Sequence, residues 1–383
     1  MRPSAIASIA EAAASARPST ARAGTRLTVR VAYEETGLEL DATGSARAAR
    51  SLRAALEERA DVELVPVAQP PGGGGRLRRG LERELTWFPL RLPRRARALG
   101  AAVLHCPMPL APPLPHPTPT VVTVNDAIPW DHPEWLTRAH AAHARLALAP
   151  ALRRAAGVLV PSAHTRERLL ARVRGLDPEA VTVTPYGVDL AFSPGPGPDD
   201  RPGPYLLAVG TLQPRKNLEA ALAAFERLHA DGLEHRLVVA GARGWRDDAL
   251  VARLHASPAA HRIDLAGRVD DAALVALYRG ASCLLFPSRA EGFGFPPLEA
   301  MACGTPVVAA AAGSLPEVVG DAAPLVAPDD HAGLAEAVAR VLADPGPWRE
   351  RGRAHAAGFT WARCAEQTVA AYRAAVTRGA RAR

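Results

Sequence analysis

Lysine is almost absent from this sequence. Of its 46 basic residues, 45 are arginine and one, Lys216, is lysine. A GC-rich coding bias accounts for so strong a preference for arginine, so the lysine kept at position 216 is a candidate functional residue. The formal net charge of +7 is spread over 383 residues, which suits anionic ligands but falls short of the charge density of a nucleic-acid-binding protein. We therefore expect no nucleic-acid partner.

Cysteines and long apolar runs are also scarce. The four cysteines, Cys106, Cys283, Cys303 and Cys364, form no C-x-x-C pair. Their spacing argues against a metal cluster or a disulfide framework and favours buried thiols in a reducing cytosol. No stretch approaches the ~18–20 apolar residues of a membrane-spanning helix. We expect a soluble, cytoplasmic protein, and a peripheral position on the inner face of the cell membrane stays open.

Short apolar runs do recur along the chain, with segments of helical pattern between them. The runs are apolar throughout rather than alternating, which is typical of parallel strands covered by helices on both faces. They are Leu27–Tyr33, Val62–Val67, Ala102–Cys106, Thr120–Asp126, Gly157–Ser162, Val181–Pro185, Tyr205–Gly210, Arg236–Gly241, Ile263–Val269, Cys283–Ser288, Pro306–Ala311 and Pro324–Pro328. The pattern predicts an α/β protein with two doubly wound parallel sheets and a ligand cleft beyond the carboxyl ends of the strands.

The length of 383 residues suits two domains. Residues 1–25 are alanine-rich without a convincing signal-peptide core, so we expect a disordered extension. The segment 193–204, SPGPGPDDRPGP, can continue neither helix nor strand and is predicted to link a first domain, 26–192, to a second domain, 205–358. Within 359–383, an amphipathic helix from Trp361 is predicted to pack back across the cleft.

The most informative segment is Ser288–Ala311, SRAEGFGFPPLEAMACGTPVVAAA. A strand ends before a loop with Gly292 and Gly294, and two prolines then suit a helix start. Such a loop offers free backbone amides and the positive end of a helix dipole to a diphosphate. Glu291 and Glu299 flank the loop, and a carboxylate can accept two hydrogen bonds from a sugar diol. Either glutamate alone would be read as a surface residue; together with the glycines and prolines they indicate a binding site.

A second candidate site lies in 206–228, LLAVGTLQPRKNLEAALAAFERL. The strand ends at Gly210, the loop carries Arg215 and Lys216, and Asn217 is predicted to cap the following helix. Two cations beside a helix N-terminus are well suited to the charge that develops on a departing diphosphate. The alternative is an ordinary solvated basic loop.

Glu291-x7-Glu299 within EGFGFPPLEAMACGTPVV resembles the signature of the retaining, nucleotide-sugar-dependent glycosyltransferases of family 4, the group 1 or mannosyltransferase-like enzymes. The resemblance runs from about residue 26 to residue 375. It implies the GT-B fold, with two Rossmann-like domains facing a deep cleft. It also implies transfer of a sugar from a UDP- or GDP-sugar to a glycan or lipid-linked acceptor with retention, as in the synthesis of cell-surface polysaccharides or glycoconjugates.

The resemblance assigns roles around the signature. Glu291 would hold the hydroxyls of the donor sugar, and Glu299 the nucleotide ribose. The amides around Phe293, Gly294 and Phe295 would meet the sugar and the diphosphate. The chain has no D-x-D cluster that would hold a divalent metal, and cations with helix dipoles can neutralise a diphosphate, so we expect neither a metal nor another cofactor.

The PRKN loop resembles the phosphate-binding loop of the family, with Lys216 at the lysine position. Many members carry an arginine directly after Gly210, where this sequence has Thr211, and Arg215 is a candidate substitute.

Two further segments are assigned to the donor site by resemblance. The turn at Gly267 and Arg268 resembles the segment whose backbone reads the nucleobase, with Asp270 as the next helix cap and Tyr278 as a core residue. Gly44 stands where the first glycine-rich loop of family members approaches the donor phosphates.

The segment TVVTVNDAIPW departs from the family pattern, which usually reads TVHD with a histidine in the cleft. Asn125 takes that position, and an amide bonds a sugar hydroxyl but cannot titrate. In the front-face mechanism of the family the leaving phosphate assists deprotonation of the acceptor, so this mechanism does not need the histidine. Asp126 either orients the loop or meets the acceptor, and His105 is either structural or an acceptor contact. Glu317, in SLPEVVGDAA, has no role that the sequence supports.

The segment Arg76–Arg97 contains eight arginines and two acidic residues, with Trp87 and Phe88 between them. Basic residues with interfacial aromatics suit an anionic membrane surface. A solvated amphipathic helix is the equal alternative.

Two other functions remain open. A nucleotide-sugar epimerase can share the two-domain architecture, but the Glu291-x7-Glu299 spacing and the lack of a convincing titratable pair in the first domain argue against it. A sugar-nucleotide-binding subunit without catalysis is hinted at only by Asn125 and Thr211.

Overall fold

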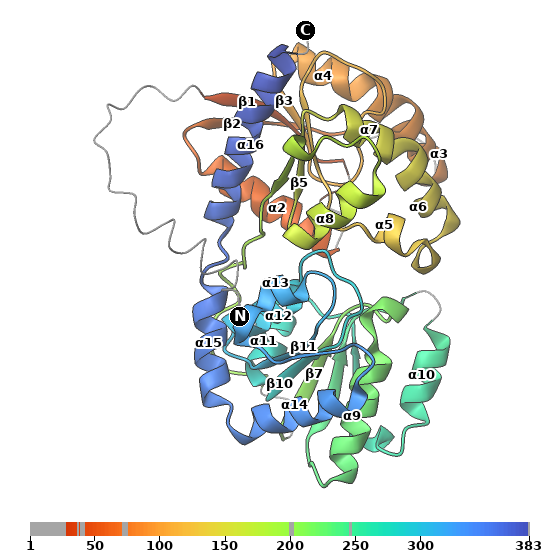
Figure 1. Ribbon diagram of the computed structural model, residues 1–383, viewed down its shortest axis with the longest axis vertical. Coiled ribbons are helices and arrows are strands. Elements are labelled where there is room, and N and C mark those ends of the chain that lie inside the picture. The colour runs from red at the N-terminus through yellow and green to blue at the C-terminus, as the bar shows by residue number, and fades with distance from the viewer. Residues whose placement is uncertain are drawn as a thin grey trace, which may run out of the picture.

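Two domains lie one above the other in the computed structural model (Figure 1). The structure describes residues 28–36, 38, 43–70, 76–198, 203–244 and 247–381. The predicted extension at 1–25 lies outside the described residues, as do positions 199–202 of the predicted linker. The described part of the linker packs on the second domain, where Arg279 Nε donates to the carbonyl of Ser193 at 2.7 Å.

The first domain is built on a parallel sheet of six strands in the order β2-β1-β3-β4-β5-β6. The strands are β1 (Val29–Glu34), β2 (Val62–Val67), β3 (Val103–Cys106), β4 (Thr120–Thr123), β5 (Gly157–Val160) and β6 (Val181–Val183). Every residue of β3, β4 and β5 is buried, which explains why these strands are apolar throughout. The chain reverses its direction across the sheet between β1 and β3, the point at which such sheets bind ligands.

The helices of the first domain lie on both faces of its sheet (Figure 1). They are α2 (Gly44–Glu57), α3 (Arg76–Glu82), the π-helix η1 (Arg83–Arg91), α4 (Leu92–Ala98), α5 (Ile128–Asp131), η2 (Pro133–Trp135), α6 (Arg138–His143), the π-helix η3 (Ala144–Leu148), α7 (Ala149–Arg154), α8 (Ala163–Arg172) and η4 (Pro178–Ala180). The chain from Arg76 to Ala98 is helical throughout, and its central turns are π-helical.

The second domain contains a parallel sheet in the order β12-β11-β10-β7-β8-β9. Its strands are β7 (Tyr205–Val209), β8 (Arg236–Ala240), β9 (Ile263–Gly267), β10 (Cys283–Phe286), β11 (Val307–Ala310) and β12 (Leu325–Val326). The order reverses between β7 and β10, so the loops that follow these two strands meet at one edge. Eleven of the twelve strands fall within the predicted apolar runs and β1 extends one residue beyond its run, to Glu34. The predicted fold class is confirmed.

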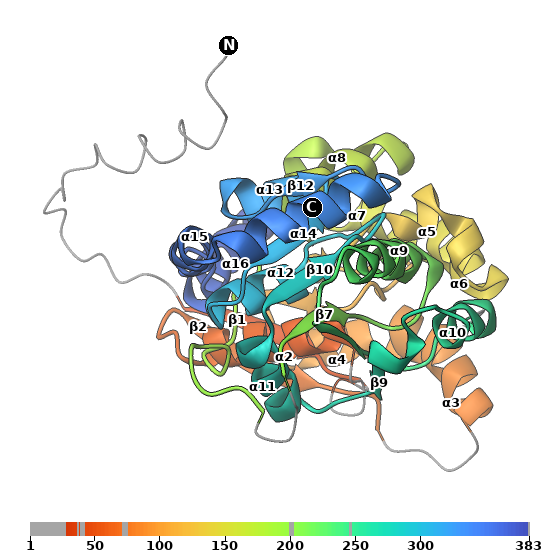
Figure 2. The same ribbon diagram turned by 90° about the horizontal axis from the view of Figure 1, so that it is seen from below.

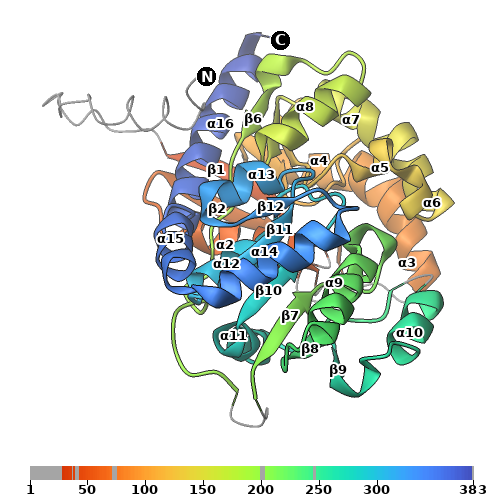
Figure 3. The same ribbon diagram turned by 60° about the horizontal axis from the view of Figure 1, so that its bottom comes forward.

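Helices cover both faces of the second sheet. Figures 2 and 3 show these helices beside the sheet. Alternate strand residues pack with α9 and α14 on one face and with α11 and α12 on the other. The helices are η5 (Pro214–Lys216), α9 (Leu218–Ala230), α10 (Asp248–His255), η6 (Ala260–Arg262), α11 (Asp271–Gly280), α12 (Phe295–Ala302), α13 (Leu315–Val319), η7 (Gly320–Ala322), α14 (His331–Ala343) and α15 (Gly346–Ala356).

Helix α16 (Trp361–Arg381) starts beside the second domain and runs along the first (Figure 1). Its Tyr372 hydroxyl lies 2.6 Å from Nδ1 of His105, whose Nε2 lies 2.9 Å from the Thr123 hydroxyl. Arg373 also reaches Asp61, with 2.7 Å between Nη2 and Oδ2. Burial lowers the pKa of His105 to about 3. His105 is therefore a neutral, fully bonded core residue that ties α16 to the first sheet, which decides between the two interpretations of this histidine.

The cysteines are buried, as expected. All four cysteines are free and buried. Within the residues described, no helix combines the length and the apolar composition needed to cross a bilayer.

The Tyr372–His105 contact yields a first prediction. Tyr372→Phe removes one hydroxyl and leaves a buried imidazole nitrogen without a partner, which costs about 1–3 kcal/mol. We expect the free energy of unfolding of the first domain, measured in urea, to fall by that amount. Thr377→Val on the same helix is the control, because Thr377 is exposed and bonds only the carbonyl of Arg373. Equal stability of the two variants would contradict the role given to Tyr372.

Candidate functional site

A partly buried cluster of charges lies where the loops after β7 and β10 meet. Nζ of Lys216 lies 2.6 Å from Oε1 of Glu291, and Nη1 of Arg215 lies 3.2 Å from Oε2. The Ser288 hydroxyl donates to Oε1 of Glu291 at 2.6 Å. One carboxylate thus accepts from three donors, two of them cationic, and the chain topology brings together the two predicted motifs.

Electrostatics keep this carboxylate ionised. Burial alone would raise the pKa of Glu291, but the charges of Lys216 and Arg215 and the hydrogen bonds outweigh it and hold the pKa at about 2. Burial lowers the pKa of Lys216, and the facing carboxylate partly restores it. The cluster therefore contains two positive charges and one negative charge that are partly shielded from water, and ionic contacts there are stronger than in bulk water.

The backbone around Lys216 explains its position. Gly210 has φ +147°, and a Cβ there would lie 3.1 Å from the Lys216 side chain, so glycine leaves room for the lysine. Asn217 has φ 53° and does not cap α9 with its side chain, contrary to the prediction. Its amide instead donates to the carbonyls of Pro287 (3.0 Å) and Pro328 (2.8 Å). The residue fastens the loop to the ends of β10 and β12 because the left-handed backbone turns its side chain away from the helix.

The glycine loop between Glu291 and α12 touches the first domain. The carbonyl of Gly292 accepts from the hydroxyls of Ser162 (2.7 Å) and Thr165 (3.0 Å) at the start of α8. A Cβ at Gly292 would lie 1.8 Å from the backbone oxygen of Asn125. Only glycine fits here, because the Asn125 loop of the first domain presses directly on it.

The aromatic residues of the loop are packed, and its helix start is open. Phe293 and Phe295 pack against Tyr186 and against each other with ring centroids 5.3–5.4 Å apart. Gly294 has φ +127° and precedes α12, which has no side-chain cap. Within the first three residues of α12, Phe295 carries the N–H that can bind an anion, because Pro296 and Pro297 have none.

Asn125 and Asp126 have different hydrogen-bond partners. Oδ1 of Asn125 accepts from the Tyr186 hydroxyl, whereas its Nδ2 is buried without a partner among the described residues. Asp126 accepts the backbone N–H of Ile128 at 3.0 Å, which is an orienting contact within its own loop. Burial raises the pKa of Asp126, and Arg215 opposes that effect.

Glu299 on α12 is paired across the domains. Its side chain is 2% exposed; it is bonded by Arg47 of α2 and accepts from the Tyr278 hydroxyl at 3.0 Å. Burial raises the pKa of Glu299, and Arg47 counteracts the rise. Gly44 lies nearby, since a Cβ on it would come within 3.8 Å of Phe295. Arg47 was missed by sequence reasoning, although its place one turn after Gly44 is a usable signal, and Tyr278 is a partner of Glu299 as well as a core residue.

Among the described residues, none of the remaining predicted residues is hydrogen-bonded to Glu291. Gly267 (φ +65°) is the last residue of the edge strand β9, and the exposed Arg268 follows it. Asp270 caps α11 as predicted, accepting the amide of Ala273 at 2.8 Å. Thr211 is partly exposed and directly follows Gly210. Among the described residues, no group of three or more His, Cys, Asp and Glu side chains could hold a metal ion.

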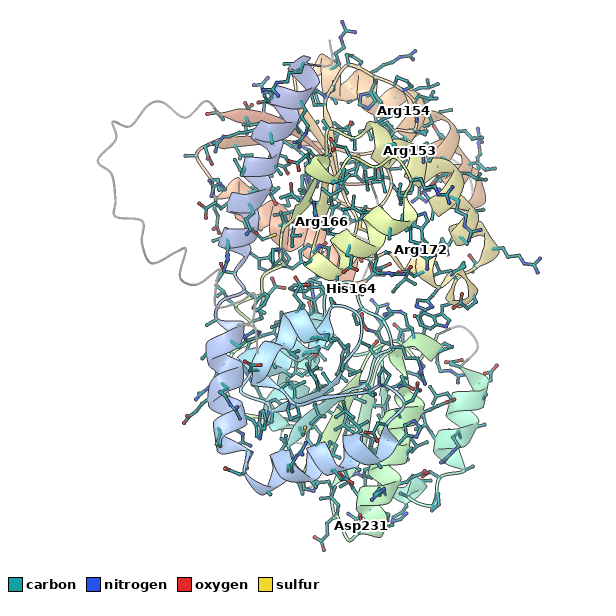
Figure 4. All side chains as sticks on the ribbon, in the orientation of Figure 1. Arg153, Arg154, His164, Arg166, Arg172 and Asp231 are labelled. Atoms are coloured by element: carbon teal, nitrogen blue, oxygen red, sulfur yellow. The ribbon has the colours of Figure 1, made fainter. Side chains whose placement is uncertain are left out.

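Glu317 on α13 makes a contact that the sequence did not suggest. Its carboxylate accepts the backbone amides of Ala163 (2.8 Å) and His164 (3.1 Å), the first two residues of α8. Figure 4 shows His164 at the end of α8 that faces the second domain. A residue of one domain thus caps a helix of the other.

Comparisons with known proteins find glycosyltransferases for both domains. A family model described as Glycosyl transferases group 1 matches residues 196–358, and one described as Glycosyltransferase Family 4 matches residues 42–192. The chain is 40% identical over 174 residues to the O-antigen chain mannosyltransferase B of Escherichia coli, covering 44% of this chain and 45% of that protein. It is 36% identical over 213 residues to the MMP alpha-(1->4)-mannosyltransferase of Mycolicibacterium hassiacum, covering 53% and 50%. The chain thus spans about half the length of the curated relatives it matches.

Solved structures share the fold. A sucrose-phosphate synthase from Thermosynechococcus elongatus superposes with a TM-score of 0.71 at 23% identity, covering 90% of this chain and 98% of that one. The Anabaena protein HepE in complex with UDP and glucose gives 0.67 at 16% identity, covering 89% and 98%.

The Glu317 contact yields a second prediction. In Glu317→Ala the first amides of α8 lose their acceptor across the domains, so we expect the amides of Ala163 and His164 to exchange with deuterium at least tenfold faster, equivalent to about 1.4 kcal/mol. Glu336→Ala, at an exposed glutamate of α14, is the matched control. Unchanged exchange in Glu317→Ala would show that the contact does not hold the domains together.

Proposed function

The chain belongs to the family 4 glycosyltransferases of the GT-B fold, and on that premise we propose that it transfers a sugar from a nucleoside-diphosphate-sugar to an acceptor hydroxyl with retention at the anomeric carbon. The observation that carries the proposal is the Glu291 cluster. A partly buried, ionised carboxylate lies between two cations, four residues before the start of α12. This is the charge arrangement that a sugar diphosphate needs.

Binding of the donor would give the charged residues of this cluster new partners. Its diphosphate would take Lys216, Arg215 and the N–H of Phe295 at the start of α12, and Glu291 would then accept the sugar hydroxyls. The two negative charges of the diphosphate would match the two cations that Glu291 gives up, and hydrogen bonds from Ser288 and the sugar hydroxyls would then satisfy the Glu291 carboxylate. No metal is required in this proposal, and we expect a chelator to leave activity unchanged.

Glu299 would accept the ribose hydroxyls. Its present partners, Arg47 and Tyr278, supply the compensation that a buried carboxylate needs while no ribose is bound. The edge turn at Gly267 and Arg268 would face the base. Gly44 at the start of α2 would approach the phosphates from the first domain.

The transfer step follows a front-face course in this proposal. The acceptor oxygen bonds to the anomeric carbon on the face from which the diphosphate leaves, the bond from that carbon to the phosphate oxygen breaks, and a phosphate oxygen takes the acceptor proton. Asn125 cannot take a proton, but its unpartnered Nδ2 would donate to a sugar or acceptor hydroxyl. Asp126 would keep the loop in place.

The names of the relatives narrow the biological setting. The Escherichia coli relative is named for O-antigen chains, and the Anabaena neighbour was solved with UDP and glucose. We propose a role in the synthesis of a cell-surface polysaccharide or glycoconjugate in the cytoplasm, with a UDP- or GDP-sugar donor and a glycan or lipid-linked acceptor.

The direct test is slow hydrolysis of candidate donors without acceptor. A panel of UDP- and GDP-sugars is incubated with the protein and followed by proton NMR. We expect free sugar from one donor, released first as the anomer that the donor carries, with or without chelator. An isomerised donor would indicate an epimerase, and no turnover of any donor would favour a binding subunit; either result would contradict the proposal.

Substitution of Glu291 and of Glu299 should affect different steps, turnover and nucleotide binding respectively. Glu299→Gln removes charge from the ribose contact, so the affinity for the free nucleoside diphosphate should fall about 10–100-fold, which is ~1–3 kcal/mol. Glu291→Gln should leave that affinity within about threefold and lower donor turnover at least ~100-fold. Calorimetry and the NMR assay separate the two effects. Equal behaviour of both variants, or behaviour like a Glu336→Gln control, would overturn the assignment.

Lys216 gives a further prediction. Its charge matters most when the diphosphate leaves, so Lys216→Ala should lower turnover on the order of 100-fold. Lys216→Arg should restore it only in part, because a planar fork replaces a compact charge. Full turnover in Lys216→Ala would contradict the leaving-group role.

A further inference from the structure

Leucines gather on the surface of the first domain, far along the chain from the donor site. Of the seven large hydrophobic side chains that are exposed among the described residues, five lie between positions 81 and 146. They are Leu81 (54% exposed), Leu85 (67%), Leu90 (42%), Leu114 (49%) and Leu146 (79%). We call this set the leucine face.

The π-helix η1 aligns three of these leucines. A π-helix bonds residues five apart, so Leu85 and Leu90 fall on one side of η1, and Leu81 lies one α-helical turn before Leu85. Trp87 and Phe88 are buried on the other side. The core therefore uses the aromatic side of this segment, and the leucine side faces outward.

The other two leucines come from segments packed beside η1. One small cavity is lined by Glu84 and Phe88 of η1, by Pro113 of the loop before β4, and by His143 and Ala147 of α6 and η3. Leu114 follows Pro113, and Leu146 precedes Ala147. In all three ribbon views α3 and α6 lie on the same side of the first domain (Figures 1–3). The five leucines thus belong to one region of the surface.

Arginines border the leucine face. Arg78 and Arg79 precede the leucine row, Arg94 and Arg95 follow it, and Arg145 adjoins Leu146; all five are exposed. Within the described part of the chain, none of these five forms an ion pair.

The two acidic residues of η1 and its preceding turn, Glu82 and Glu84, already form ion pairs. Glu82 is paired with Arg91 at 2.8 Å, and Glu84 lies between Arg83 and His143. The free charge of the region is therefore positive, while its centre is aliphatic.

We propose that the leucine face docks the protein on an anionic lipid bilayer. Leucines that stand out from a basic surface can enter the interface while the arginines stay at the level of the phosphates. A second copy of the chain suits this surface poorly, because a two-fold contact would place the arginines against each other. The inference does not depend on the proposed function, since none of the five leucines or the bordering arginines belongs to the donor site.

Sedimentation with sucrose-loaded vesicles tests this inference. We expect binding to vesicles of equal parts phosphatidylcholine and phosphatidylglycerol, at least ~10-fold weaker binding to phosphatidylcholine alone, and loss of binding as salt shortens the Debye length. The triple variant Leu81→Gln, Leu85→Gln, Leu90→Gln should bind at least ~10-fold more weakly. Leu190→Gln with Leu265→Gln is the control, because these leucines are exposed elsewhere (96% and 40%).

A charge-matched pair of variants tests the arginines. The variant with Arg78, Arg79, Arg94 and Arg95 changed to glutamine should lose binding and its salt dependence. The control changes Arg227, Arg340, Arg349 and Arg363, which are exposed outside this region, and should bind as the unchanged protein does. Circular dichroism during heating identifies any variant that fails to fold, and single-leucine variants then replace it.

Three outcomes would overturn the inference. The first is no vesicle binding at any salt concentration. The second is equal binding by the leucine variant and its control. The third is a concentration-dependent dimer in analytical ultracentrifugation that the leucine substitutions abolish while vesicles remain unbound, which would assign the face to a second copy.

Discussion

The contact between Glu291 and its two cations is the interaction on which the rest of the site depends. A carboxylate that is largely withdrawn from water, as Glu291 is with 12% of its side chain exposed, needs partners because its desolvation is costly. Lys216 and Arg215 come from the loop after β7, and Glu291 and Ser288 follow β10. These loops meet because β7 and β10 are neighbours in the sheet, at the point where the strand order reverses. The topology of the second domain is therefore what assembles the charges.

The first domain supplies partners for three polar groups of the second domain. The Gly292 carbonyl, the Glu317 carboxylate and the Glu299 carboxylate each find their partners on α2 or α8. All three contacts lie on segments around the proposed donor site, so the first domain helps to shape that site. Helix α16 also connects the two domains, because it begins beside the second domain and its Tyr372 is hydrogen-bonded to His105 of the first sheet.

The sequence predicted features whose cause is local and missed those whose cause is distant. Strands buried on both faces show as continuous apolar runs, so all twelve could be found. The Glu291 and Lys216 motifs were visible because their residues are neighbours in the chain. The Arg47–Glu299 pair and the Glu317 cap join residues 252 and 154 positions apart, and no local pattern reveals such partners. The predicted Asn217 cap was wrong because its left-handed backbone redirects the side chain.

A crystal structure with the intact donor, obtained at low temperature or with a non-hydrolysable analogue, tests the central claim most directly. We predict that Nζ of Lys216 will have moved from Glu291 to a phosphate oxygen, and that the Glu291 carboxylate will accept hydrogen bonds from sugar hydroxyls. A donor bound elsewhere, with Lys216 and Glu291 still bonded to each other, would contradict the account.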